Sequence, residues 1–172
     1  MAPITIDIVQ FMDKNFMAWR KVDKLSLAIL LAAAGHFGQH DKGGNPYITH
    51  PMRVMFWSHP LNSIRRQIAI LHDVIEDTLI TLEDLHRLGF CKEVIDGVRA
   101  LTKNNELTYS ENIDRVLEDI NACYVKRDDL RDNLDVTRLK DLSQKTFDKN
   151  IEYLISYHRI DTRIREYEGQ LG

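Results

Sequence analysis

Four ionisable side chains lie within one otherwise apolar stretch of the 172-residue chain, namely His72, Asp73, Glu76 and Asp77. The apolar residues before them recur at helical spacing and predict one helix from Ser63 to about Asp77. On this helix His72 and Glu76 lie one turn apart, as do Asp73 and Asp77, so all four project from one side. Three carboxylates at such close quarters repel one another unless a cation or a proton compensates. The pattern therefore indicates a divalent metal site.

An alternative interpretation is a solvated acidic helix end beside a core histidine, which is the commoner situation for a single His-Asp pair. The neighbouring residues Leu71, Val74 and Ile75 weaken this interpretation, because they indicate that the turn is mostly buried. A buried cluster of acidic groups favours a functional site over a solvated surface.

The loop from Gly38 to Pro51 carries a further candidate. It is the only long stretch punctuated by glycine and proline, and His50 lies at its end, just before Pro51 begins a new helix. Proline fixes the backbone beside this histidine, which suits a metal ligand. For such a residue taken alone, a capping or core role is the commoner one.

A polar segment, Val125 to Leu134, carries the last candidates. Asp129 and Asn133 lie one helical turn apart there, and the apolar Val125 and Leu130 would hold the segment against the core. The alternative is a solvated helix. The two interpretations differ in whether Asp129 is buried.

The remaining chain predicts further helices, over residues 4–19, 25–37, 52–57, 81–89, 91–101, 110–122 and, as one or two helices, 143–172. The short helix over 52–57 is expected to be buried. Thr81 and Asp84 predict a capping box at the start of one of them. The last segment is expected to close the bundle or to form an oligomer contact, so a homo-oligomer stays open.

Composition favours one all-α domain over residues 1–172. The chain is 44% hydrophobic and 28% charged, with eight glycines and four prolines, which excludes disordered and linker-rich architectures. The net charge of −3 argues against a non-specific nucleic-acid binder, which would show a basic excess. An anionic substrate must then be met by local cations or by a metal.

The two cysteines and the N-terminus bear on location. Cys91 and Cys123 stand far apart without metal-ligand spacing and are expected to be buried thiols in a reducing compartment. Residues 1–11 show no signal sequence, and no window approaches ~18 uninterrupted apolar residues. We expect a cytoplasmic protein without membrane association.

In order and spacing, His50, His72-Asp73 and Asp129 match the HD phosphohydrolase superfamily, named for its paired His-Asp ligands. Four longer sequence motifs resemble the hydrolase domain of RelA/SpoT enzymes. They are Pro46-Tyr47-Ile48-Thr49-His50-Pro51, Leu71 to Thr78, Leu101-Thr102 and Val125 to Asn133. The resemblance covers roughly residues 25–139. Because no synthetase domain follows, it is greatest to the stand-alone small alarmone hydrolases. It implies an HD-type helical bundle on which the C-terminal helices, residues 143–172, pack.

The resemblance also implies a site and a reaction. The implied metal ligands are His50, His72, Asp73 and Asp129, with one Mn²⁺ per chain. The implied acidic pair that activates the attacking water is Glu76 and Asp77. The implied nucleotide contacts are Lys42, Tyr47, Lys103 and Asn133. The reaction would release pyrophosphate from the 3′ position of (p)ppGpp, the alarmone of the stringent response, and leave GDP or GTP.

One residue departs from the family pattern. Relatives that hydrolyse ppGpp commonly carry an Arg-Lys pair in the substrate loop, whereas Asp41 precedes Lys42 here. This exchange removes a stacking and bidentate donor beside a polyphosphate. Hydrolysis of (p)ppApp or of the phosphate of NADPH is therefore an alternative, and a catalytically silent nucleotide-binding domain is another. The presence of all four ligands and both acidic residues argues against silence.

Overall fold

Helix α5 (Ser63–Leu71) lies at the centre of the fold. The computed structural model describes residues 16–58, 62–138 and 143–171, and the regular elements in these ranges are helical, as predicted. Around α5 pack four helices, α3 (Lys24–Gly35), α4 (Thr49–Trp57), α8 (Lys92–Leu101) and α10 (Ile120–Asn133). The residues of α5 from Gln67 to Leu71 are all buried, so this helix forms the middle of the core.

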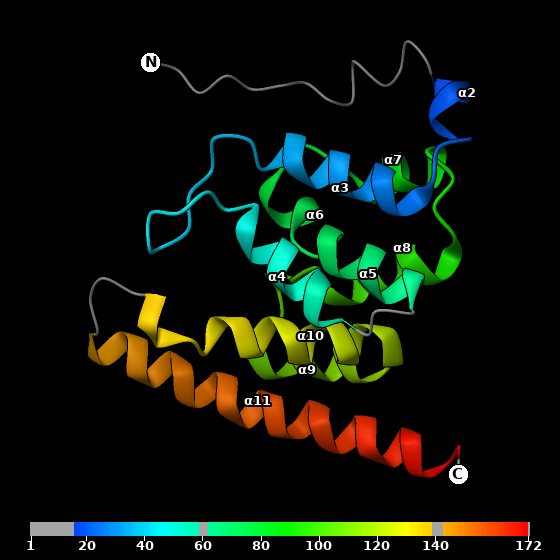
Figure 1. Ribbon diagram of the computed structural model, residues 1–172. Coiled ribbons are helices and arrows are strands. Elements are labelled where there is room, and N and C mark those ends of the chain that lie inside the picture. Colours follow the sequence, from blue (N-terminus) through cyan, green and yellow to red (C-terminus); the bar gives the residue numbers. More distant parts are fainter. Residues whose placement is uncertain (1–15, 59–61, 139–142, 172) are drawn as a thin grey trace.

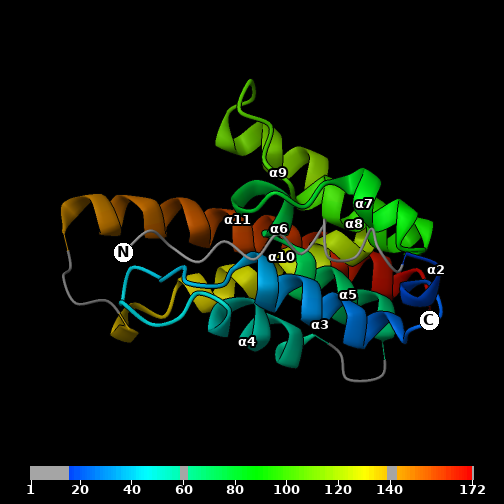
Figure 2. The ribbon, with the colours of Figure 1, turned by 90° about the horizontal axis from the view of Figure 1, so that it is seen from above.

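The helices are stacked in layers (Figure 1). From one side to the other the layers hold α3 and α7 (Leu82–Arg87), then α4, α5, α6 (Val74–Asp77) and α8, then α9 (Tyr109–Leu117) and α10, and finally α11 (Gln144–Gly169). The remaining elements are α2 (Phe16–Trp19) and η1 (Val136–Arg138). Figure 2 shows from above that α11 runs lengthwise past α10, against which it packs.

Side chains that bind the free N–H groups of the first turn fix the beginnings of several helices. The hydroxyl of Thr81 accepts the N–H of Asp84, whose carboxylate accepts the N–H of Thr81 in return. The capping box predicted at these residues is therefore confirmed. Thr108 and Glu111 form a second capping box at the start of α9.

The helix predicted over residues 63–77 is in fact two helices, because the chain leaves the helical path at His72 and Asp73. The Nδ1 atom of His72 lies 2.7 Å from the carbonyl oxygen of Ala69 and donates to it. A continuous helix would offer that carbonyl to the N–H of Asp73, so the side chain competes with the helix here. Asp73 instead occupies the N-cap position of α6.

The helix predicted over residues 110–122 also divides. Asp119 begins a new helix by accepting the N–H of Ala122 at 2.9 Å. The polar segment 125–134 therefore lies within a longer helix, α10. Its Asp129 is buried, so the alternative of a solvated helix is wrong at this residue.

Burial differs from the prediction at two places. In α4, Met52, Phe56 and Trp57 are exposed, although their pattern indicates a buried helix. The reason is that α4 is an outer helix, which packs against α5 and α10 through one face. Cys123 is buried as predicted, whereas Cys91, the residue before α8, is exposed.

The C-terminal segment forms one helix, α11, which packs along α10 and α9. Its buried residues are Ser156, Ile160 and Ile164. In its first half Ile151, Leu154 and Ile155 are exposed, and an oligomer contact there stays a prediction. The helix predicted over residues 4–19 lies outside the described residues except for α2. None of the described helices has the length and apolar character needed to cross a bilayer.

Candidate metal centre and active site

Two histidines and two aspartates from distant parts of the chain meet at the break between α5 and α6. They are His50 in the first turn of α4, His72 and Asp73 at the break itself, and Asp129 on α10. The Nε2 atom of His50 lies 3.2 Å from Oδ1 of Asp129 and 3.7 Å from Oδ2 of Asp73. The Nε2 atom of His72 lies 2.8 Å from the same Asp73 oxygen and 3.8 Å from the same Asp129 oxygen. The structure thus brings together the four residues implied as metal ligands.

The four side chains have the character of a cation site. One potential ligand atom each from His50, His72 and Asp129 lie within 4.8 Å of one another. The buried Nε2 atom of His72 meets no acceptor with hydrogen-bond geometry among the described residues, although a carboxylate oxygen of Asp73 lies 2.8 Å away. Because the Nδ1 atom of this ring donates to the backbone, the neutral ring presents a lone pair at Nε2. A buried lone pair beside two carboxylates fits a divalent metal ion.

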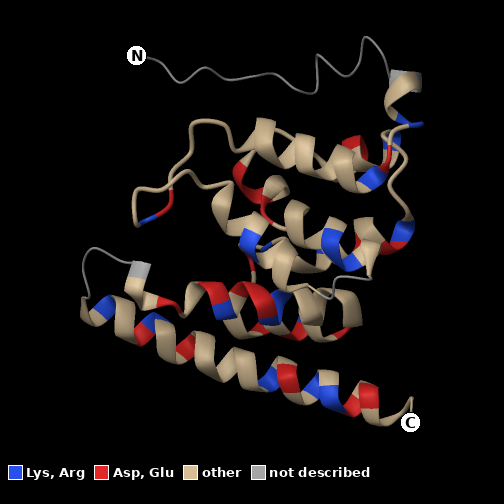
Figure 3. Cartoon of the chain, in the orientation of Figure 1, with Lys and Arg blue, Asp and Glu red and all other residues tan. Residues whose placement is uncertain are grey.

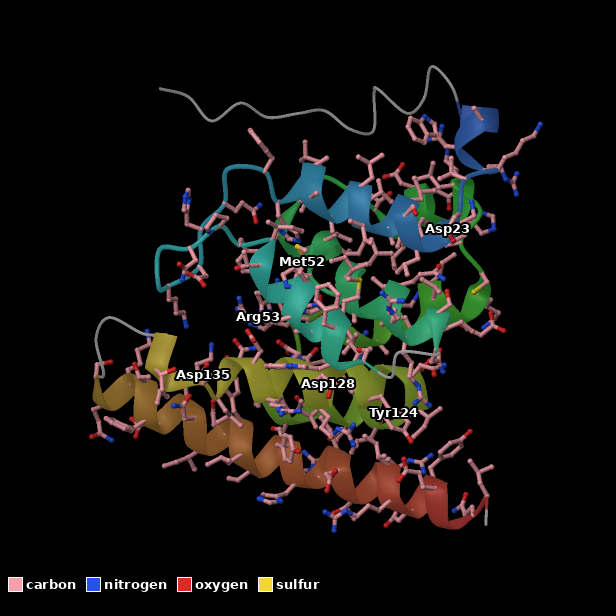
Figure 4. All side chains as sticks on the ribbon, viewed as in Figure 1. Asp23, Met52, Arg53, Tyr124, Asp128 and Asp135 are labelled. Atoms are coloured by element: carbon pink, nitrogen blue, oxygen red, sulfur yellow. The ribbon has the colours of Figure 1, made fainter. Side chains whose placement is uncertain are left out.

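A buried ion pair holds the other nitrogen of His50. The Nδ1 atom donates to Oδ2 of Asp132 at 2.7 Å. Arg53 donates to both oxygens of that carboxylate, at 2.6 Å from Nε and 2.9 Å from Nη2, and Figure 4 shows it between α4 and α10. Asp132 is only 1% exposed. These bonds fix the imidazole with Nε2 turned toward Asp129, as the outer partners of metal-binding histidines do.

In the metal-free protein, protons hold the cluster together. Burial lowers the pKa of His50, but the carboxylates of Asp129 and Asp132 outweigh burial and raise this pKa to about 9. Burial raises the pKa of Asp73, but the positive charge of the His72 ring outweighs burial and lowers this pKa to about 2. A divalent cation would replace these protons, because an imidazole must lose its proton to bind a metal.

A pocket of about 810 Å³ opens beside the cluster, within the range typical of small-molecule sites. Its walls come from the loop between α3 and α4, from α6 and α10, and from the first turns of α11. Of the predicted metal ligands, His50, Asp73 and Asp129 line it, and His72 lies behind them. The cluster therefore faces a space that a nucleotide could enter.

Glu76 and Asp77 follow the cluster on α6, and both line the pocket. One carboxylate oxygen of Glu76 accepts the backbone N–H of Lys103 at 2.6 Å, which fixes the direction of this side chain. Burial raises the pKa of both carboxyl groups. Because a higher pKa makes a carboxylate a better proton acceptor, the pair can serve as general base and acid. Lys103 is not among the described residues that line the pocket, and its backbone N–H binds Glu76, so its role as a nucleotide contact stays a prediction.

The other residues predicted to contact the nucleotide, Lys42, Tyr47 and Asn133, line the pocket. Two of them also bind predicted metal ligands. Tyr47 donates its hydroxyl to Asp73, and Asn133 donates its amide to Oδ1 of Asp129 at 2.6 Å. These hydrogen bonds orient the carboxylates of Asp73 and Asp129. The sequence did not predict this orienting role of Tyr47 and Asn133.

Three side chains beside the cluster were missed in the sequence, namely Arg53, Lys126 and Asp132. The Nζ atom of Lys126 lies 2.8 Å from Oδ2 of Asp129. Helical spacing could have found all three residues. Lys126 and Asp132 lie three positions to either side of Asp129, and Arg53 lies three positions after His50, so each shares a helix face with a predicted ligand.

Asp41, the departure from the family pattern, is part of its own loop. Its Oδ1 atom accepts the N–H of Asn45 at 2.8 Å, and its backbone N–H donates to the carbonyl of Asn45 at 2.9 Å. Its carbonyl accepts the N–H of Gly44, whose φ of 84° is a conformation that favours glycine. Asp41 therefore acts as a turn residue while it lines the pocket.

Comparison with known proteins agrees with this geometry. The bifunctional (p)ppGpp synthase/hydrolase SpoT of Escherichia coli strain K12 is 31% identical over 134 residues, which are 70% of this chain and 19% of SpoT. The chain is a homologue of the SpoT/RelA enzymes. A guanosine-3′,5′-bis(diphosphate) 3′-pyrophosphohydrolase of Vibrio cholerae is 29% identical over 140 residues, 74% of this chain and 20% of that protein. The chain thus spans about a fifth of the length of these curated SpoT relatives.

The fold has a counterpart among solved structures. A protein described as a metazoan ortholog of SpoT that hydrolyzes ppGpp and plays a role in starvation responses matches with a TM-score of 0.67 and 23% identity. The match covers 88% of this chain and 97% of that chain. The predicted all-α, HD-type fold is therefore confirmed. No family model matches the sequence.

Proposed function

We propose that this protein uses a Mn²⁺ ion to hydrolyse the 3′-pyrophosphate of (p)ppGpp, which yields GDP or GTP and pyrophosphate. The observation that carries the proposal is the meeting of His50, His72, Asp73 and Asp129 at a pocket that two further carboxylates line. The activities for which the SpoT relatives are named support the choice of substrate.

The ligand set accommodates several divalent metals of the first transition row, because it mixes imidazole and carboxylate. We choose Mn²⁺ because it is the metal that the resemblance implies. When bound, the metal would lower the pKa of a coordinated water and neutralise charge on the phosphoryl group. Hydrogen bonds orient two of the proposed ligands, because Asp132 binds Nδ1 of His50 and Tyr47 binds the carboxylate of Asp73.

Glu76 would accept the proton of the attacking water. Burial raises its pKa, and the N–H of Lys103 fixes its orientation, so its free oxygen can be aimed at the nucleophile. The water oxygen bonds to the phosphorus next to the ribose, and the bond from that phosphorus to the 3′ oxygen breaks. Asp77, whose pKa burial also raises, would protonate the departing 3′ oxygen.

A substrate panel tests the proposal. Protein stripped of metal and reloaded with Mn²⁺ is given ppGpp, pppGpp, ppApp and NADPH, and the release of pyrophosphate and of phosphate is measured. We expect pyrophosphate from ppGpp and pppGpp with metal and none after chelation. A Glu76→Gln sample purified in the same way controls for contaminating phosphatases. Absence of pyrophosphate release from both ppGpp and pppGpp would refute the proposal.

A second candidate keeps the chemistry and changes the substrate to (p)ppApp or NADPH. It is favoured by Asp41, which stands where guanine-specific relatives commonly carry arginine and which is held in its own turn by Asn45. The same panel separates the two, because a higher kcat/KM for ppApp or NADPH than for ppGpp would select the second candidate.

A further inference from the structure

Besides Lys126 at the metal cluster, three lysines from two separate segments line the pocket. Lys42 belongs to the loop between α3 and α4, and Lys145 and Lys149 lie one turn apart at the start of α11. Figure 1 shows this loop and the start of α11 on the same side of the molecule, and Figure 3 shows basic residues on both. All three lysines line the same pocket as the predicted metal ligands.

Lys145 and Lys149 are near enough to Lys42 to repel its ammonium group. The charge of Lys149, together with burial and the charge of Lys145, lowers the pKa of Lys42. Within residues 16–58, 62–138 and 143–171, none of the three forms an ion pair with a carboxylate. Lys149 instead stands over the ring of Tyr153, with its Nζ atom 5.3 Å from the ring centre. Like charges gathered in this way favour the binding of a polyanion.

Besides the carboxylates of the metal cluster and of α6, two further carboxylates line the pocket, and both are engaged in their own turns. Asp41 accepts the N–H of Asn45, and Asp135 accepts the N–H and the hydroxyl of Thr137. Such local bonds between an Asp side chain and nearby backbone are typical of turns. The carboxylates are thus held by their own loops, and the lysines are left to face the pocket.

We propose that Lys42, Lys145 and Lys149 bind the phosphate chain on the 5′ side of the nucleotide while its 3′-pyrophosphate lies against the metal centre. The inference rests on the proposed function, because it assigns a second subsite in the same pocket. A nucleotide with phosphates at its 3′ and 5′ positions carries negative charge at both ends of the ribose. A metal bound at the 3′ end can neutralise only the charge there. Lysines act as point charges on flexible stems, so one set can bind either two or three 5′ phosphates.

Kinetics with two substrates test this subsite. The metal-loaded protein is assayed with ppGpp and with guanosine 3′-diphosphate, which has the cleaved group but no 5′ phosphates. The double substitution Lys145→Gln with Lys149→Gln is expected to raise KM for ppGpp about tenfold or more, the scale of charge-assisted hydrogen bonds. Its kcat for ppGpp, and both constants for guanosine 3′-diphosphate, should stay near those of the wild type. Lys42→Gln should also raise KM for ppGpp.

Arg165→Gln is the matched control, because it removes a positive charge from an exposed position on the same helix, where Arg165 pairs with Asp161. It should leave kcat and KM unchanged for both substrates. If the lysine variants lose equal activity with both substrates, or none with either, the subsite is wrong while the proposed function stands. A wild type that cleaves neither substrate refutes the proposed function and the subsite with it. Circular dichroism of each variant checks that α11 remains folded.

Discussion

Glu76 is the side chain that should separate chemistry from metal binding. A glutamine here keeps the shape and can still accept the N–H of Lys103, but it cannot take a proton from water. We therefore expect Glu76→Gln to lower kcat by ~10²–10⁴-fold. Its Mn²⁺ affinity, measured by calorimetry, should stay unchanged, whereas Asp73→Asn should lose the metal. Normal turnover by metal-loaded Glu76→Gln would show that another group is the base.

Asp132 should matter through His50 and not through contact with the substrate. Replacing it with asparagine weakens the bond to Nδ1 and the pairing with Arg53. We expect Asp132→Asn to reduce Mn²⁺ affinity ~10–100-fold, as the loss of outer partners of metal ligands typically does. Calorimetric titration of the folded variant measures this change.

Asp128→Asn is the control for Asp132→Asn. Asp128 is also buried on α10 (Figure 4), but its Oδ1 atom lies 3.8 Å from Nε of Arg127 and it is not among the described residues that line the pocket. Equal losses of affinity in both variants would indicate a general loosening of α10 and would contradict a specific role for Asp132.

The sequence predicted which side chains form the cluster better than it predicted their hydrogen-bond and ion-pair partners. The histidines and carboxylates of the cluster could be singled out because burial of several acidic groups demands compensation. The pairing of Arg53 with Asp132 could not be predicted, because the two residues lie 79 positions apart and only the packing of α4 on α10 brings them together.

Among the elements, the contact of α5 with α8 depends on Gly97. A Cβ atom at this position would lie 2.4 Å from Cδ1 and 3.0 Å from Cγ1 of Ile68, a side chain buried on all sides. We expect Gly97→Ala to lower the free energy of unfolding by about 1–3 kcal/mol, the usual cost of overpacking. Alanine's better helix propensity offsets part of this cost. Denaturant unfolding measures the change.

Ile68→Val tests the cause, because it removes the nearest atom. Combined with Gly97→Ala it should cost less than the sum of the two single substitutions. Strict additivity would show that the two side chains do not clash and that the glycine serves another purpose.

Helix boundaries were predictable where a cap marks them and not where a side chain interrupts a periodic pattern. Thr81 and Asp84 form a signal that is complete within four residues. The break at His72 arises from an imidazole that takes the carbonyl of Ala69, and apolar spacing carries no trace of that bond. Asp119 caps α10 without a capping box, because Ala122, three residues later, has no carboxylate to complete one, and the apolar spacing continues across it.

For the molecule as a whole, His36 links three elements near the pocket. Its Nδ1 atom lies 2.8 Å from Oε1 of Gln39, and the amide of Gln39 donates to the carbonyl of Asp77 at 2.7 Å. Burial lowers the pKa of His36, and the bond to Gln39 and the charges of Asp73 and Asp77 offset burial only in part. The end of α3, the substrate loop and α6 are therefore joined through a neutral imidazole.

This lowered pKa makes stability depend on pH. The unfolded chain, with a histidine pKa near ~6.5, binds the proton before the folded protein does. The free energy of unfolding should therefore fall as pH drops from ~6.5 through the folded pKa. His36→Asn keeps a donor but cannot titrate, so it should flatten this slope in urea unfolding of the metal-free protein. An unchanged slope would assign the dependence to other groups.

The assembly of the pocket could not be predicted from any one segment. Lys42 and Lys149 are separated by more than half of the chain and meet because α11 returns along α10. Local patterns identify helices, but they do not say which end of one helix lies beside which loop.

The spread of the predicted metal ligands from residue 50 to residue 129 has a consequence for the life of the protein in a cell. An ion bound by all four would tie α4, the α5–α6 break and α10 to a single point. Because it would bind the folded chain alone, a hundredfold excess over Kd would add about 2.7 kcal/mol of stability. Ordinary domains have only ~5–15 kcal/mol in total. A cell starved of this metal would therefore degrade the protein faster, so that metal supply would govern its abundance as well as its turnover.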